Sequence, residues 1–286
     1  MSSAGARMDC PRCSTNVREH ERHCPACYHD VGFPNVRVAQ KPEERAALGR
    51  RYKSAEASAA VRGCSAVLAE FCTAVRSSQG VICRPLSIVL GLLSSDSSLY
   101  ASFYSLTAAG ARRPEDTEAD RLRLQADDLL FPHYREQIRF AALSLNGRGV
   151  ASFGEYSLVL KDVAIRERAT VFEENSVEFF RKRDFTFGSA VPPGYRAPWD
   201  QRERLAVAKL GTALRDDTRS QEFPELLLRP SPVPFQEDFV EVHIYGPLHC
   251  QSVERVLGPT PKRKADRILL KQLEDLLSGL GTGGTT

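Results

Sequence analysis

Residues 239–247 carry a carboxylate (Glu241), an imidazole (His243) and a phenol (Tyr245) at every second position. This alternation predicts a β-strand whose one face presents these groups together with Phe239, while the other face presents valine and isoleucine to a core. A Gly-Pro dipeptide then ends the strand. Such a polar row is unusual for a strand that only fills space, so Glu241 is the candidate functional acid. An edge strand with a solvated polar face is the alternative.

Four cysteines near the N-terminus, Cys10, Cys13, Cys24 and Cys27, form two CxxC pairs separated by ten residues. Two such pairs place four thiolates at about 2.3 Å from one zinc ion in tetrahedral geometry. A segment this short cannot bury enough apolar surface to fold alone, so metal binding would supply its folding energy. Disulfides are the alternative, but no signal peptide indicates secretion. Residues 8–31 therefore resemble a zinc ribbon.

The predicted ribbon does not by itself indicate a function. A docking or capping module is the preferred interpretation, and contact with a phosphate backbone stays open. The arginines that would make such a contact are Arg7, Arg12, Arg18 and Arg22. The cysteines outside the ribbon are predicted to be small buried hydrophobic residues. They are Cys64, Cys72, Cys83 and Cys250.

The length of 286 residues indicates one large domain, or a medium domain with a small appendage. Apolar residues make up 42% and charged residues 26% of the chain, which is the ordinary globular range. The net charge of +3 predicts a mixed surface and not a nucleic-acid clamp. No apolar run reaches the roughly 18 residues of a membrane span, so we expect a cytoplasmic protein without a membrane partner.

The pattern of apolar residues divides the chain into four parts: a zinc ribbon (1–33), a linker and helix (34–79), a main domain (80–278) and a disordered tail (279–286). The expected helices are residues 55–77, a second beginning at Pro85, and 200–214, 251–257 and 262–277. The expected strands are residues 99–106, 138–145, 158–160 and 168–172. Residues 110–127 are expected to form a solvated helix or loop.

Three stretches, in their order and spacing, resemble the ADP-ribosyltransferase-like fold of bacterial toxin-type enzymes. The first is RFAALSL from Arg139 followed by SFGEYSLVL from Ser152. The second is RATVFEENS from Arg168, with Asn175 where such members carry Asp, and the third is VEVHIYGPL from Val240. The resemblance covers about residues 80–258. It implies an α+β fold with a split β-sheet core and flanking helices, preceded by the zinc ribbon.

The resemblance implies an NAD-dependent ADP-ribosyltransferase, a toxin or defence effector that modifies a macromolecule. Cleavage of the nicotinamide–ribose bond passes through an oxocarbenium-like state, which a fixed carboxylate stabilises. Glu241 would be the catalytic residue and would also hold the ribose 2′-hydroxyl. The residues that would bind NAD are Tyr104, Arg139, Gly154, Tyr156 and Ser157. Arg84 is a second candidate for the position assigned to Tyr104.

Phe239 stands two residues before Glu241, where arginine-modifying members carry Glu, so it argues against an arginine acceptor. Together with the ribbon arginines, it favours a nucleic acid over a protein as the acceptor. Glu237 is the candidate acceptor base, and an antitoxin or chaperone partner is compatible with such an effector. Two other functions stay open. One is a catalytically inactive module that docks a partner protein or nucleic acid, and the other is a zinc-stabilised regulator.

Overall fold

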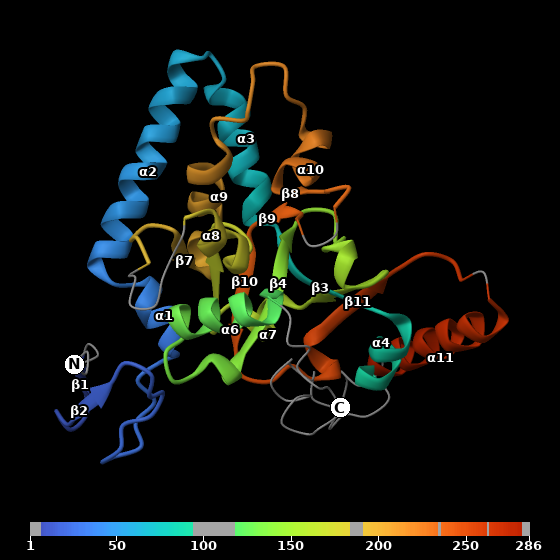
Figure 1. Ribbon diagram of the computed structural model, residues 1–286, viewed down its shortest axis with the longest axis horizontal. Coiled ribbons are helices and arrows are strands. Elements are labelled where there is room, and N and C mark those ends of the chain that lie inside the picture. The colour runs from blue at the N-terminus through green and yellow to red at the C-terminus, as the bar shows by residue number, and fades with distance from the viewer. Residues whose placement is uncertain (1–6, 94–117, 184–190, 234–235, 262, 282–286) are drawn as a thin grey trace.

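One seven-stranded antiparallel β-sheet forms the centre of the molecule, and helices cover both of its faces (Figure 1). The computed structural model describes residues 7–93, 118–183, 191–233, 236–261 and 263–281. In sheet order the strands are β11 (Val253–Leu257), β5 (Tyr156–Leu160), β3 (Gln79–Arg84), β4 (Ile138–Ser144), β10 (Glu241–Tyr245), β6 (Ala169–Phe172) and β7 (Arg196–Pro198). The fold is therefore of the mixed α+β class, as predicted.

The strand predicted at Glu241 is β10, which pairs antiparallel with β4 on one side and β6 on the other. Glu241 lies opposite Ala142 and Phe172, and residues paired in this way share one face of the sheet. The predicted alternation is confirmed, because Val242 and Ile244 belong to the main core on the other face. The solvated edge strand is wrong, since β10 is an inner strand whose polar residues are buried.

The main core joins the Val242 face of the sheet to several helices, among them α2 (Pro42–Val61), α3 (Ser65–Arg76) and α9 (Arg202–Leu210). Leu48, Phe71 and Leu205 bring one apolar side chain from each helix into this core. The single helix expected at residues 55–77 is wrong. Gly63 has a φ of +73°, a conformation that ends a helix, and it separates α2 from α3.

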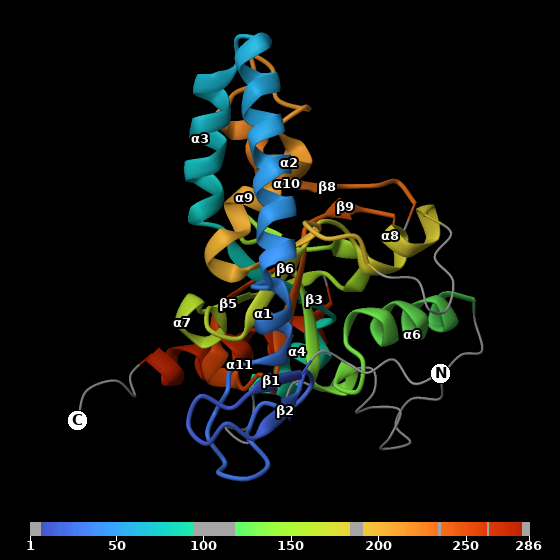
Figure 2. The same cartoon turned by 90° about the vertical axis from the view of Figure 1, so that its left-hand side faces the viewer.

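The Glu241 face is covered by α6 (Glu118–Leu130) and α8 (Ser176–Lys182), which lie on the same side of the sheet (Figure 2). Phe131 and Phe179 pack there in a second core with Ile138 of β4 and Phe172 of β6. The described part of residues 110–127 is helical, one of the two conformations expected, but it is not fully solvated, because Ala126 and Asp127 of α6 are buried. Its apolar side faces this second core.

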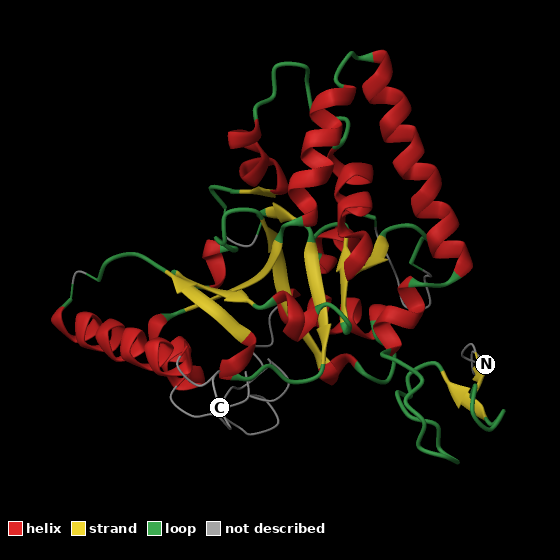
Figure 3. Cartoon of the chain, turned by 180° about the vertical axis from the view of Figure 1, so that it is seen from behind, coloured by secondary structure: helices red, strands yellow, loops and turns green. Residues whose placement is uncertain are grey.

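The opposite edge of the sheet carries β11 and two packed helices, α4 (Leu86–Leu93) and α11 (Lys264–Gly281) (Figure 3). The helix expected at residues 251–257 is wrong. Residues 253–257 pair with β5 instead, and this tertiary pairing decides the conformation of a short apolar run. The smaller elements are α7 (Asp162–Ile165), α10 (Phe223–Leu227) and the pair β8 (Leu228–Arg229) and β9 (Asp238–Phe239).

The N-terminal segment contains the hairpin of β1 (Arg7–Asp9) and β2 (Asn16–Arg18), and α1 (Pro34–Ala39) connects it to the body. Arg37 of α1 fixes this connection, because its guanidinium donates to the carbonyls of Glu19 (2.6 Å), Glu21 (2.8 Å) and Val31 (3.3 Å). The N-terminal segment is therefore attached to α1 through its backbone carbonyls, which accept from the Arg37 side chain.

Some expected features fall partly or wholly outside the described residues. The strand expected at residues 99–106, which includes Tyr104, lies outside them. Of the segment expected as a tail, residues 279–281 continue α11 and the rest is not described. Among the helices that the structure describes, none combines the length and the apolar character needed to cross a membrane.

Candidate functional site

The Glu241 carboxylate lies at the centre of a buried polar cluster, and 3% of this residue is exposed. Its Oε2 accepts a hydrogen bond from the backbone N–H of Ser176 (3.1 Å) and lies 2.9 Å from His243 Nε2. Its Oε1 accepts from Arg123 Nη1 at 3.3 Å. The donors come from three elements, α8, β10 and α6, so the carboxylate is fixed from three directions.

Arg123 places a guanidinium between Glu241 and the surface. Its side chain is 23% exposed, against 4% for the carboxylate that it covers. The guanidinium also stacks on the Phe140 ring, 3.6 Å from the ring centroid, and pairs with Asp127 one turn along α6 at 3.1 Å. The guanidinium is thus held by two carboxylates and one aromatic face. Helix α6 therefore closes the approach to Glu241 from this side.

His243 stands two residues after Glu241 on the same face of β10, which is why its ring reaches the carboxylate. Its imidazole lies among three aromatic rings, those of Phe131 (4.9 Å between centroids), Phe140 (5.4 Å) and Phe172 (5.7 Å). These rings shield the imidazole from solvent, and 3% of His243 is exposed. His243 is thereby held as a fixed neighbour of the acid.

The surroundings keep Glu241 ionised. Burial alone would raise the pKa of this carboxyl, but the Arg123 charge and the hydrogen bonds from His243 and Ser176 outweigh it and lower the pKa to about 2. The site therefore holds an ionised carboxylate, paired with Arg123, in a place of low dielectric. Such a charge can stabilise a positive charge that develops beside it.

Of the residues expected to bind NAD, three that the structure describes, Arg139, Tyr156 and Ser157, are not gathered around Glu241. Arg139 lies opposite Ile244, so it shares the face of the main core, and the register from β10 through β4 and β3 places Tyr156 on that face as well. Ser157 is on the Glu241 face. However, β3 and β4 separate its strand from β10, a distance of about 14 Å at the usual strand spacing.

Each of these expected residues has a contact within the fold. Arg139 donates to the carbonyls of Glu136 (2.8 Å) and Ile138 (3.2 Å), and Tyr156 donates to that of Pro259 (3.1 Å). Ser157 Oγ accepts from the N–H of Gly149 (3.2 Å).

Gly154 has a φ of +144°, and a Cβ there would lie 2.2 Å from the Arg84 carbonyl carbon. The close approach expected at Gly154 is thus made by the end of β3. Tyr104 lies outside the described residues.

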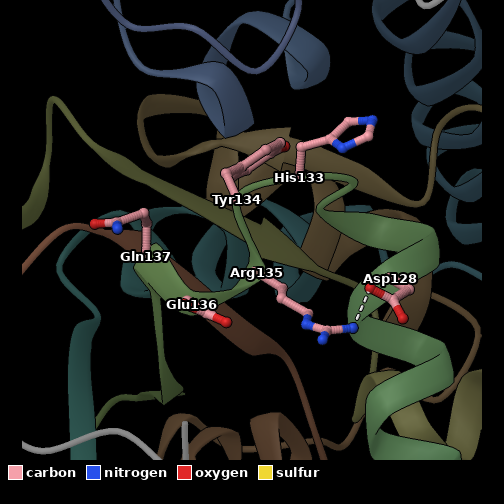
Figure 4. A pocket seen from close by; sticks show the side chains of 6 residues that line it. All are labelled: Asp128, His133, Tyr134, Arg135, Glu136 and Gln137. Atoms are coloured by element: carbon pink, nitrogen blue, oxygen red, sulfur yellow. Dashed lines mark hydrogen bonds and ion pairs between the residues drawn. The ribbon is translucent and has the colours of Figure 1, made fainter. Parts of the chain in front are cut away.

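A surface pocket of about 330 Å3 lies at the start of β4 (Figure 4). It is lined by Asp128 and by residues 133–137, and Glu241 is not among its lining residues. Figure 4 shows Arg135 turned towards Asp128, with which it forms an ion pair, while His133 and Tyr134 point towards the N-terminal segment. The His133 ring there contacts the ring of His20 (4.8 Å between centroids). The pocket therefore lies beside the junction of ribbon and body.

The four N-terminal cysteines converge as the sequence predicts. Their sulfur atoms all lie within 4.8 Å of one another, with 3.7 Å from Cys10 to Cys27 and 3.5 Å from Cys13 to Cys24. A disulfide requires about 2.05 Å between sulfurs, whereas four ligands around one ion at about 2.3 Å lie about 3.8 Å apart. The arrangement can hold a metal ion.

The two CxxC turns also repeat each other in backbone geometry. Cys10 N–H bonds to the Thr15 carbonyl at 2.8 Å, and Cys24 N–H bonds to the His29 carbonyl at 2.9 Å. The residue after each pair has a φ of +57°, Ser14 in the first turn and Tyr28 in the second. This repetition presents the two pairs of thiols symmetrically to one point. The other four cysteines are buried, as predicted.

Sequence reasoning missed two members of the Glu241 cluster, Arg123 and the N–H of Ser176. The spacing of Arg123 and Asp127, four residues apart, was a visible signal of a helical ion pair. Nothing local indicated that the same guanidinium reaches a carboxylate 118 positions later. No protein-family model matches this chain, and no curated protein matches it either.

Proposed function

We propose that this protein is an NAD-dependent ADP-ribosyltransferase, a toxin or defence effector, with Glu241 as its catalytic residue. The observation that supports the proposal is the fixed, ionised Glu241 carboxylate on an inner strand. Two of the three stretches that resemble the enzyme family also meet there, because Ser176 N–H, at the end of the second stretch, bonds to Glu241 in the third. This proposal includes the split-sheet fold of that family.

In the proposed reaction, the bond between the anomeric carbon of ribose and nicotinamide breaks, and its electron pair leaves with nicotinamide. A nucleophile on the acceptor then bonds to that carbon and loses its proton. Glu241 would accept a hydrogen bond from the ribose 2′-hydroxyl and stabilise the oxocarbenium-like state. His243 and the Ser176 N–H would hold the carboxylate in place. Because Arg123 covers the carboxylate, substrate binding would require α6 to move.

The acceptor is proposed only as a macromolecule. Residues 1–33 contain four arginines and four carboxylates, so the ribbon has no excess positive charge that would favour a nucleic acid over a protein.

Incubation of the pure protein with labelled NAD and with RNA, DNA or cell lysate tests the proposal. Label transfer or nicotinamide release is expected from the wild type and not from Glu241→Gln. Glu44→Gln is the matched control, because Glu44 is another buried carboxylate, paired with Arg196 at 3.0 Å. Glu44→Gln is expected to keep activity, and only Glu241→Gln is expected to lose it. Absence of transfer and of nicotinamide release with every acceptor would contradict the proposal.

A second candidate is a catalytically inactive module that docks a partner, and the covering of Glu241 favours it. The three donors to the carboxylate are all groups of this protein, so the carboxylate has partners without a bound substrate. A buried cluster of this kind can also serve to hold a fold together. This candidate predicts partner binding without NAD turnover, and binding that survives Glu241→Gln wherever that variant folds.

We propose zinc as the metal of the four-cysteine cluster, because four thiolates in tetrahedral arrangement are the ligand set of structural zinc. The cluster leaves no open position for a substrate, so the metal would stabilise the ribbon and take no part in catalysis. Elemental analysis of the purified protein is expected to give one zinc per chain. Cys13→Ser should lower that ratio, and an unchanged ratio would contradict the assignment.

A further inference from the structure

A smaller pocket, about 140 Å3, lies between α8 and the segment that leads into β9. Four carboxylates line it, from Glu174, Glu178, Glu237 and Asp238. The pocket is next to the Glu241 cluster in the chain, because Asn175 lines it and the following residue, Ser176, donates to Glu241.

Three of these carboxylates are already neutralised by cations of the chain. Glu174 pairs with Lys182 at 2.6 Å and with Arg183 at 2.9 Å, and Glu178 pairs with Arg181 at 2.5 Å. Asp238 pairs with Lys209. These pairs account for the charge of three of the four carboxylates.

Glu237 is the exception. The residue is 6% exposed, and among the described residues no cation pairs with it. Its Oε1 accepts from the N–H of Ser152 at 3.3 Å and from the Ser152 hydroxyl. Its Oε2 is buried and accepts no hydrogen bond from any residue that the structure describes. A carboxylate enclosed without a counter-charge is costly to maintain, so its presence beside a pocket indicates a cationic ligand.

We infer that this pocket binds the ammonium group of a lysine side chain on a partner protein. A guanidinium prefers to bridge both oxygens of a carboxylate, but Ser152 already occupies Oε1. The single free oxygen suits a point-like ammonium, whose remaining N–H groups can reach the neighbouring acceptors of the pocket. The volume is that of one side-chain end and not of a nucleotide.

This inference does not rest on the proposed enzymatic activity, since it concerns binding alone. Where both hold, the lysine would stand beside the Glu241 cluster as an acceptor.

Titration of the metal-loaded full chain with Nα-acetyl-lysine methylamide, followed by amide NMR, tests the inference. We expect saturable shifts at Asn175, Glu178 and Glu237 with a dissociation constant in the roughly millimolar range. Nε-acetylated lysine, which lacks the charge, and the arginine analogue should bind at least about tenfold more weakly. These ligand comparisons use the wild type only, so they do not depend on the folding of any variant.

Two variants complete the test. Glu237→Gln should weaken lysine binding at least about tenfold. Glu178→Gln should not, because Glu178 lines the same pocket but has its own cation. Equal binding by Glu237→Gln and the wild type, equal binding of acetylated lysine or arginine, or no saturable shift would each overturn the inference. Absence of NAD turnover would leave it standing.

Discussion

Glu241 and Glu44 are two buried glutamates whose pKa values shift in opposite directions when the protein folds. Both are buried carboxylates held by an arginine and a backbone N–H. Burial raises the pKa of Glu44, and the opposing effects of Arg196 and the Gly194 N–H do not reverse this. At Glu241, the additional hydrogen bond from His243 contributes to a lowered pKa. Because the two pKa values shift in opposite directions, the way stability changes at acid pH reports whether the Glu241 cluster keeps its carboxylate ionised.

A carboxyl whose pKa is lowered on folding stabilises the protein above its unfolded pKa, and this contribution is lost as the pH falls through the folded pKa. The lowering at Glu241, from 4.5 to about 2, corresponds to about 3 kcal/mol. The difference in unfolding free energy between wild type and Glu241→Gln should therefore be constant above about pH 5 and shrink towards pH 2. Urea denaturation at a series of pH values measures it.

Glu44→Gln supplies the control of opposite sign. Because the pKa of Glu44 is raised, its contribution to stability is present at low pH and is lost as the pH rises through the folded pKa. The difference between wild type and this variant should shrink in the direction opposite to that of Glu241→Gln. Parallel curves for the two variants would show that the Glu241 cluster does not hold its carboxylate ionised.

Substitution of Gly154 tests whether the close approach of its backbone to Arg84 contributes to stability. A methyl group there would meet the Arg84 backbone at 2.2 Å, at a positive φ. Gly154→Ala should therefore lower the free energy of unfolding by roughly 2–4 kcal/mol, measured by urea denaturation. Gly63→Ala is the matched control, since Gly63 also has a positive φ but faces open space. A loss of about 1 kcal/mol is expected there, and equal losses would exclude the clash.

Residue patterns predicted those parts of the candidate site that depend on neighbours along the chain. The period of two placed Glu241 and His243 on one face, and the CxxC spacing predicted the metal cluster. Arg123 could not be found in this way, because its contact with Glu241 depends on where α6 lies over the sheet. The side of the sheet on which Arg139 lies could not be predicted either, because it follows from the register of β4 with β10.

At the scale of elements, the short helix α8 contributes directly to the site, because its first N–H, that of Ser176, donates to Glu241. Asn175 begins the helix, and its side-chain oxygen accepts from the Val177 N–H at 3.0 Å. Because Ser176 lies between Asn175 and Val177, this bond also orients the Ser176 N–H towards Glu241. The start of α8 is thus coupled to the site.

Asn175→Ala should lower the free energy of unfolding by about 1 kcal/mol, because the N-cap bond is lost. It should also weaken the bond from Ser176 to Glu241 and so speed the exchange of the Ser176 amide hydrogen. Denaturation and hydrogen exchange measure the two effects. Asn175→Asp keeps an acceptor oxygen at the cap and should retain both properties. Should the alanine variant exchange at the wild-type rate, the cap would not position this bond.

Sequence predicted the elements whose pattern is local, and tertiary contacts decided the others. The strands β4 and β6 were predicted within a few residues from apolar β-branched and aromatic runs. Residues 253–257 were expected to be helical but pair with β5, and the charged start of α6 hid the apolar side that packs on Phe172. In both cases a short or mixed pattern allowed two conformations, and the position of the sheet selected one.

At the scale of the whole molecule, the ribbon and the body meet through few but well-defined contacts. Arg37 bonds to three ribbon carbonyls, Lys41 pairs with Glu19, and the His20 ring contacts the His133 ring at 4.8 Å between centroids. The ribbon has a small apolar cluster of its own, built around two of the metal-site cysteines and Val17. Such a cluster is too small to fold without the metal.

Removal of the metal should therefore unfold the ribbon and leave the sheet intact. After treatment with a chelator, the amides of Cys10 and Cys24, now bonded within the two turns, should exchange as fast as unfolded peptide. Those of Val242 and Ile244 in β10 should keep their protection, because their strand is buried between β4 and β6. Arg37→Ala is the matched control, since it releases the ribbon carbonyls but keeps all four cysteines. It should preserve metal content and the protection of the turns. Equal loss of protection in β10 and the ribbon on chelation would instead make the metal part of the stability of the whole fold, and the two parts would then unfold as one unit.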